Sequence, residues 1–73
     1  MVDYKIIKIN NNSYIEEFYN GTKSWYQDGK YHRLDGPAIE WSGGHKYWYY
    51  EGKHIDCSNQ EEFERIIKLM IFW

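Results

Sequence analysis

The sequence predicts a mainly β fold, an antiparallel meander of β-hairpins followed by one C-terminal amphipathic α-helix. Three observations lead to this prediction. The chain repeats itself with a period of 23 residues, short runs rich in Tyr, Trp and Ile alternate with turn dipeptides, and the hydrophobic spacing becomes helical after residue 58. A chain of 73 residues is long enough for one small domain, which we expect to span residues 1–73.

The repeat defines the turns and strands. Both copies follow Gly-x-Lys-x-Trp-Tyr-x-acid-Gly-Lys, one from Gly21 and one from Gly44. Residues that tolerate positive φ predict tight turns at Asn20-Gly21, Asp28-Gly29, Gly43-Gly44 and Glu51-Gly52. After an N-terminal strand and turn in residues 1–12, the hairpin repeats fill residues 13–55. The expected strands are Tyr4–Ile9, Ser13–Tyr19, Thr22–Gln27, Pro37–Trp41, His45–Tyr50 and Lys53–Ile55.

The repeated stretch resembles a known family. The run W-Y-x-D-G-K-x-H and the following D-G-P-A-I-E-W-x-G-G resemble MORN repeats, over residues 13–55. The variant G-K-x-H-R-x-D-G-P-A is similar to the form in small bacteriophage and large-virus proteins. This chain departs from the usual repeat at Arg33, where a Gly is common, and at Pro37-Ala38. The resemblance implies a hairpin sheet and an accessory role inside an infected bacterium.

The C-terminal segment, residues 58–73, predicts a helix. Ser58 and Glu61 have the spacing of a capping box. Phe63, Ile66, Ile67 and Met70 then form one apolar stripe, which we expect to cover one face of the sheet. The last five residues are all apolar, so the end packs either on its own sheet or at an oligomer interface made by Met70, Phe72 and Trp73.

Aromatic residues make up 21% of the chain, and strand alternation places them on both faces of the expected sheet. Trp25 and Trp48 share one face, whereas Tyr26, His45 and Tyr49 share the other. One helix covers only one face, so the second face is left for water, a ligand or another subunit. The surplus of aromatic side chains on this second face predicts a homo-oligomer.

Charge and cysteine content exclude several classes of protein. A net charge of −2 predicts no binding to long nucleic acid and no attraction to anionic membranes. The start of the chain does not resemble a signal peptide, and no apolar run reaches the ~20 residues of a membrane span. A lone cysteine, Cys57, fits a reducing compartment. We therefore expect a cytoplasmic protein, in the host cytoplasm if it is viral.

Catalysis and metal binding are disfavoured. Cys57, His54 and Asp56 are close in sequence, but Cys57 stands where the last strand meets the helix, and Asp56 and Ser58 are typical of local capping groups. His54 and Cys57, with His32 or His45, lack the paired spacing of a zinc site. We predict that the protein is not an enzyme and that it binds neither a metal ion nor a cofactor.

The remaining candidates point to binding. The predicted binding residues are Trp25, Tyr26, His32, Arg33, Asp35, His45, Trp48 and Tyr49. Arg33 with His32 and Asp35 forms either an anion grip or a lock on the turn before Pro37.

Together with the resemblance, these residues predict a non-enzymatic phage accessory protein that inhibits a host defence system by binding a host protein. One alternative is an oligomeric sponge for a small nucleotide signal, with aromatic side chains stacked on the base. Another is a scaffold module.

Overall fold

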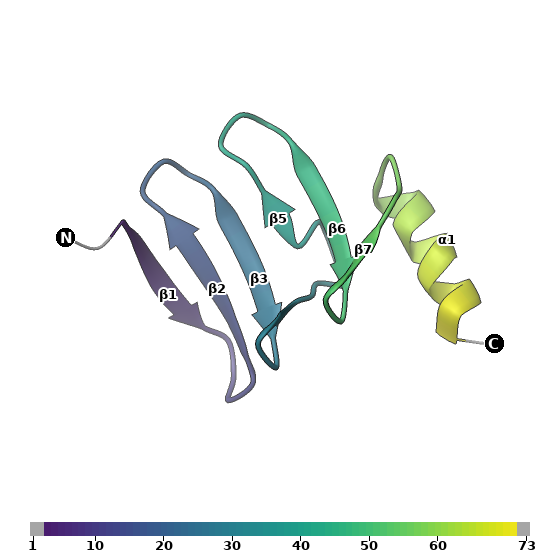
Figure 1. Ribbon diagram of the computed structural model, residues 1–73, viewed down its shortest axis with the longest axis horizontal. Helices are drawn as coiled ribbons and strands as arrows, with labels where there is room; N and C mark the ends of the chain where they lie inside the picture. Colours follow the sequence, from purple (N-terminus) through teal and green to yellow (C-terminus); the bar gives the residue numbers. More distant parts are fainter. Residues whose placement is uncertain (1–2, 72–73) are drawn as a thin grey trace.

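Seven strands and one helix are present in the computed structural model, which describes residues 3–71 (Figure 1). The strands pair antiparallel in the spatial order β1-β2-β3-β5-β6-β7, and β4 pairs with β3. This arrangement confirms the predicted mainly β meander with a C-terminal helix. The bounds are β1 (Tyr4–Lys8), β2 (Ser13–Phe18), β3 (Lys23–Gln27), β4 (Lys30–Tyr31), β5 (Ile39–Glu40), β6 (Lys46–Tyr50), β7 (Lys53–Ile55) and α1 (Gln60–Ile71).

The 23-residue repeat is reproduced in the backbone. Asp28 and Gly29 have φ values of 53° and 79°, and Glu51 and Gly52 have 48° and 84°. Two successive residues at positive φ make a type I′ turn, whose twist matches that of the flanking strands. Each repeat thus forms the same two-residue hairpin. The pair is β3–β4 in the first repeat and β6–β7 in the second.

An interrupted strand lies between β3 and β6. In β4, Tyr31 is opposite Tyr26, and in β5, Ile39 is opposite Ser24. Trp25 lies between these pairs; its N–H donates to the carbonyl of Ala38 (2.8 Å) and its carbonyl accepts from the N–H of His32 (3.0 Å). Residues 33–37 therefore leave the sheet at His32 and return at Ala38, and we call them the excursion. The six predicted strands are present to within two residues, but β4 and the excursion were not predicted.

Helix α1 begins at Gln60, and its cap lies one residue later than predicted. The side chain of Asn59, not Ser58, accepts the N–H of Glu62 (2.8 Å), and the N–H of Ser58 donates to the Glu62 carboxylate (3.3 Å). The helical cap is therefore shifted by one residue from the predicted Ser58–Glu61 box. Phe72 and Trp73 lie outside the described residues.

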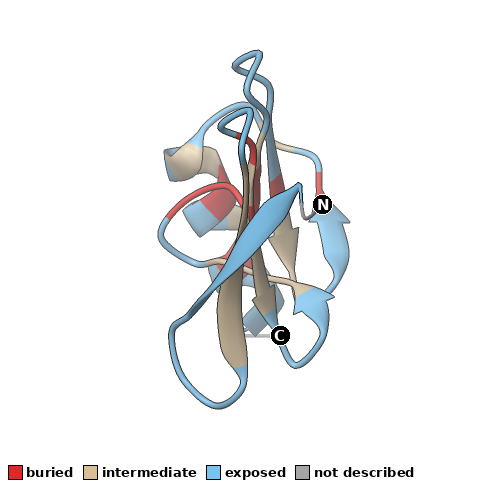
Figure 2. Ribbon diagram, turned by 90° about the vertical axis from the view of Figure 1, so that its left-hand side faces the viewer, coloured by how far each residue is buried: buried red, intermediate tan, exposed pale blue. Residues whose placement is uncertain are grey.

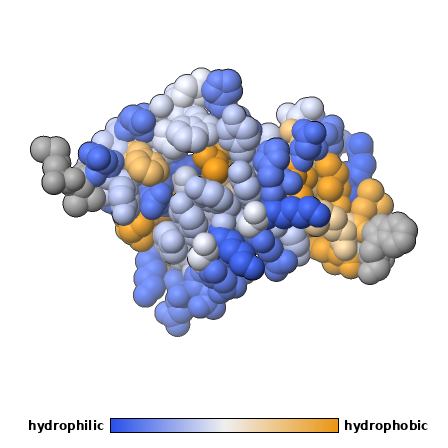
Figure 3. Space-filling model, in the orientation of Figure 1, coloured by the Kyte–Doolittle hydropathy of each residue, from blue (hydrophilic) through white to orange (hydrophobic). Residues whose placement is uncertain are grey.

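The prediction that α1 covers one face of the sheet is wrong in one respect, because the helix covers only one end of that face. Phe63 and Ile67 pack on Trp48 and Ile55, at the β6–β7 end of the sheet, and Met70 stays partly exposed. Figure 1 shows α1 beside β7, at the opposite end from β1, and Figure 3 shows hydrophobic residues gathered over it. The Cα radius of gyration, 12.8 Å, exceeds the roughly 11 Å of a compact chain of this length. The principal extents of 45 × 29 × 15 Å describe an elongated, thin molecule.

Candidate functional site

The two faces of the sheet differ in what lies over them. The face that carries Trp25 and Trp48, here called the helix face, packs against α1 and the excursion. The opposite face, here called the tyrosine face, bears Tyr4, Tyr14, Tyr26, Tyr31, Tyr47 and Tyr49, together with Phe18, Ile39 and His54. Within residues 3–71, the segments that leave the sheet lie on the helix face, so the tyrosine face is open.

Five rings on the tyrosine face, each from a different strand, touch one after another through four contacts. Ring centroids are 4.9 Å apart for Tyr14–Tyr26, 4.9 Å for Tyr26–Tyr31, 5.0 Å for Tyr31–Tyr49 and 5.3 Å for Tyr49–His54. Such offset and tilted contacts each stabilise by about 0.5–1.5 kcal/mol beyond burial of area. They hold the side chains in fixed rotamers while the outer surface of the row stays half-exposed. We call these five residues the aromatic row.

Tyr26 lies between Tyr14 and Tyr31 in the row. Burial among the neighbouring rings, the hydrogen bond with Tyr31 and the charge of Glu16 raise the pKa of the Tyr26 phenol above its usual value. Its hydroxyl lies 3.4 Å from the Glu16 carboxylate, to which it donates. The Tyr26 phenol is therefore a neutral hydrogen-bond donor at this position of the row.

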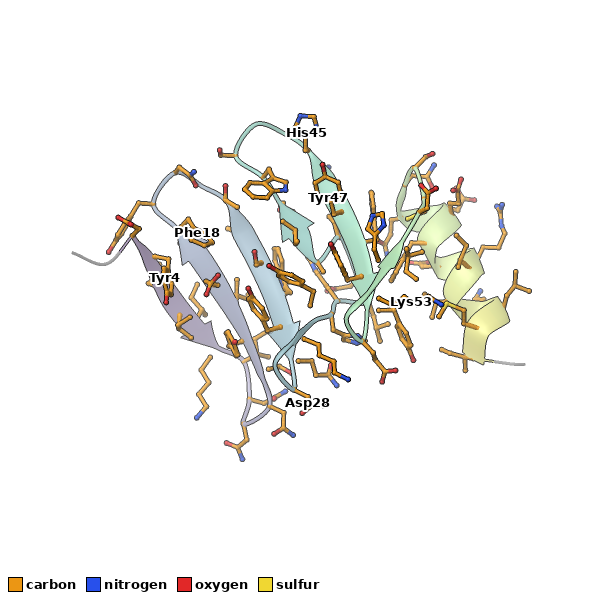
Figure 4. All side chains as sticks on the ribbon, in the orientation of Figure 1. Tyr4, Phe18, Asp28, His45, Tyr47 and Lys53 are labelled. Carbon is orange, nitrogen blue, oxygen red and sulfur yellow. The ribbon has the colours of Figure 1, made fainter. Side chains whose placement is uncertain are left out.

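A hollow of about 470 Å³ lies beside the row, at the tip of the β5–β6 hairpin. Ile39 forms its floor, and Trp41, His45, Tyr47 and Tyr49 line it. His45 and Tyr47 are labelled in Figure 4, where both lie toward this hairpin tip. The hollow is open and largely aromatic, so it suits an apolar or planar group.

Tyr14, Tyr31, Trp41 and Tyr47 are among the residues of this face that were not predicted as binding residues. The repeat contained a signal for Trp41, because it stands 23 residues after Phe18. Phe18 packs against Tyr4 at 5.4 Å on the same face (Figure 4). Tyr31 was missed because β4 was missed.

The predicted residues His32, Arg33 and Asp35 lie around the excursion, away from the tyrosine face. The Arg33 guanidinium is 3.8 Å from the centre of the Trp25 ring. Its Nε donates to Asp35 (2.9 Å), and its Nη1 donates to Glu40 (2.9 Å) and to the carbonyl of Pro37 (3.2 Å). The Arg33 hydrogen bond holds the pKa of the Asp35 carboxyl below its usual range. This geometry favours the turn lock over the anion grip, because carboxylates of the chain already hold the guanidinium.

His32 and Trp48 also have structural partners. His32 Nδ1 accepts the N–H of Glu51 (2.9 Å), which ties the first repeat to the second hairpin turn. Trp48 is only 7% exposed and lies under α1, where its Nε1 donates to Gln60 (2.8 Å). A side chain this buried offers no surface to a ligand, so Trp48 is removed from the binding set. The predicted residues on the open face are Tyr26, His45 and Tyr49.

The histidine and cysteine near the helix N-terminus do not form a joint site. The His54 ring faces Tyr47 and Tyr49, whereas Cys57 packs against the core beneath α1 on the other face. Burial and the charges of Glu62 and Asp56 raise the pKa of the Cys57 thiol, which disfavours the nucleophilic thiolate. Among residues 3–71, no group of three His, Cys, Asp or Glu side chains is placed to hold a metal ion.

Within the same residues, no helix has the length and apolar character needed to cross a membrane. Comparison of the chain with protein-family models, curated proteins and solved structures finds no match. The MORN resemblance therefore stays a prediction, and functional inference depends on the geometry of the tyrosine face.

Proposed function

We propose that this is a non-enzymatic binding protein that attaches to another protein through its tyrosine face. The observation that carries the proposal is the aromatic row, a set of five touching rings on a sheet face left open by α1 and the excursion. Tyr and Trp are enriched at the centres of protein interfaces because they combine a large apolar area with a polar tip.

The arrangement of the rings supports a protein partner. Because the rings already contact one another, binding orders few side chains, and the side-chain entropy lost on association is small. The face is broad and thinly charged, which suits the surface of a folded protein. The resemblance to MORN-type phage proteins supports a host protein as the target, in the host cytoplasm, with inhibition of a defence component as the outcome.

A second candidate, the sequestration of a small nucleotide, is favoured by the hollow beside Trp41. Trp41 and Tyr47 offer flat surfaces to a base, and His45 stands at the rim. The lining contains no Lys or Arg to neutralise phosphate, so we rank this function second. Ligand binding to the folded state alone raises Tm. An unchanged Tm with linear and cyclic nucleotides at millimolar concentration would exclude the second candidate.

The protein-binding proposal is tested by comparative capture from bacterial lysate. The bait proteins are the wild type, Tyr47→Ser and Tyr19→Ser. Tyr47 is 40% exposed on the tyrosine face, and Tyr19 is 75% exposed in the turn after β2, so the second variant is a matched control. The proposal expects one protein that is retained by the wild type and Tyr19→Ser and lost with Tyr47→Ser. The same affinity for all three baits, measured with that protein purified, would contradict it.

A further inference from the structure

The free edge of the sheet at β1 has the properties of an interface between two copies of this chain. All five residues of β1 are exposed, and Ile6, which is 51% exposed, stands at its centre. Figure 2 shows this strand in the exposed colour at the front of the molecule. Apolar side chains project from both sides of the strand, because Ile6 lies on the tyrosine face and Ile7 on the helix face. An unpaired, apolar edge strand is a template for pairing with another strand.

The hydrogen bonds to β2 show which backbone groups of β1 are free. The N–H of Ile9 donates to Ser13 (2.9 Å), and the carbonyl of Asp3 accepts from Tyr19 (3.2 Å). Hydrogen-bonded pairs alternate along an antiparallel ladder, so the residues between them that face β2 are Lys5 and Ile7. The N–H and carbonyl groups of Tyr4, Ile6 and Lys8 therefore point outward, away from the sheet.

We propose that two copies of the protein dimerise by antiparallel pairing of β1 with β1, about a twofold axis at Ile6. Ile6 then lies opposite Ile6 of the second copy and exchanges both backbone hydrogen bonds with it. Tyr4 lies opposite Lys8 of the second copy, and Lys5 lies opposite Ile7. Such an interface is isologous and closes at two subunits.

Charge and strand length select this register over its neighbours. The outward residues of β1 are Tyr4, Ile6 and Lys8, so a symmetric pair that aligns more than one of them is centred on residue 5, 6 or 7. Centring on Lys5 places two lysines directly opposite each other, which is destabilising. Centring on Ile7 pairs only residues 6–8 of the strand. Centring on Ile6 pairs all five residues and places no like charges opposite each other.

Both lysines of β1 find suitable neighbours in this register, although edge lysines usually oppose pairing. Lys5 is already held 3.4 Å from Glu17 of its own chain, and its aliphatic stem would lie on Ile7 of the second copy. Lys8 would lie beside the Tyr4 ring, a favourable neighbour for a cation. The dimer joins the two sheets into one, with the two tyrosine faces continuous across the axis. Formation of the dimer does not depend on the protein partner proposed above.

Mass and cross-linking together test the dimer. Light scattering or sedimentation from micromolar to millimolar concentration should give a mass that rises to twice the 9.0 kDa of the chain. Ile6→Pro removes only an outward N–H and should abolish the dimer, whereas Ile6→Val keeps that N–H and should retain it. A monomer at every concentration would overturn the proposal. Loss of the dimer with Met70→Ser but not with Ile6→Pro would overturn it too, because it would assign the interface to α1.

Cysteine pairs test the register without the proline variant. In a Cys57→Ser background, a mixture of the Lys5→Cys and Ile7→Cys proteins should form a disulfide-linked dimer under mild oxidation. These positions would be a non-hydrogen-bonded pair, with Cα atoms ~4.5 Å apart and within reach of a disulfide. Cross-linking of the Lys5→Cys protein alone, or of the Ile7→Cys protein alone, would overturn the register. Absence of a cross-link in the mixture would overturn the pairing itself.

Discussion

Trp25 and Trp48 stand 23 residues apart in equivalent positions of the two repeats, and they lie on the same face of the sheet under different covers. Trp25 lies beneath the guanidinium of Arg33, which the excursion supplies. Trp48 lies beneath α1 and donates to Gln60. The chain after each hairpin thus shields the tryptophan of that hairpin, and no segment within residues 3–71 covers the opposite face in this way.

Because Trp25 and Trp48 are covered differently, replacing each with alanine should lower the free energy of unfolding by a different amount. Trp48→Ala removes the centre of the core cluster and should lower the free energy of unfolding by about 3–5 kcal/mol, enough to unfold much of a domain this small. Trp25→Ala removes a half-buried ring and should cost less than half of that amount. Urea unfolding followed by circular dichroism measures both. Equal losses would mean that the two tryptophans are equally buried.

The ion pairs of Arg33 predict a measurable coupling with Glu40. The pair joins the excursion to β5 at 2.9 Å and is partly shielded, so a double-mutant cycle with Arg33→Met and Glu40→Gln should give a coupling of about 0.5–1 kcal/mol. Gly36→Ala should disturb the same group, since a Cβ there would lie 2.7 Å from the Arg33 Cζ. Additive effects of Arg33→Met and Glu40→Gln would count against the turn lock.

The second hairpin turn predicts a stabilising substitution. Glu51 has a φ of 48°, in the left-handed region that a glutamate side chain disfavours and asparagine tolerates. Glu51→Asn should raise the free energy of unfolding by about 0.5–1 kcal/mol, and Gly52→Ala should lower it by about 1–2 kcal/mol. Thermal melting of both variants checks the signs. A Glu51→Asn variant with a lower Tm would contradict the turn assignment.

The raised pKa of Cys57 predicts slow alkylation of the folded protein. Iodoacetamide at pH 8 should react several-fold more slowly with the native chain than with the chain in urea, because burial and two nearby carboxylates disfavour the thiolate. Because the pKa of the Cys57 thiol is higher in the folded chain than in the unfolded chain, its contribution to the free energy of unfolding is fully present below the unfolded pKa. That contribution is lost as pH rises from the unfolded pKa through the folded pKa. The Cys57→Ser variant should lack that part of the decline. Equal alkylation rates would show that Cys57 is not shielded.

The sequence predicted the hairpins because their determinants are local. A Gly after Asp28 or Glu51, between β-branched and aromatic runs, is sufficient to predict a turn and two strands. The excursion depends instead on Arg33 meeting Trp25 and Glu40, and the position of α1 depends on packing against Trp48 and Ile55. Contacts between residues that are distant along the chain decided these two features. The same contacts bury Trp48 beneath α1 and hold Arg33 against carboxylates of its own chain, whereas Tyr26 and Tyr49 lie on the open tyrosine face.

A partner bound on the tyrosine face should shield that face from solvent. Hydroxyl-radical footprinting of the complex with a captured protein, read by mass spectrometry, measures this shielding residue by residue. We predict that Tyr47 and Trp41 become protected from oxidation in the complex, while Tyr19 and Met70 react as they do in the free protein. Protection of Met70 on α1, with Tyr47 and Trp41 unchanged, would contradict the account.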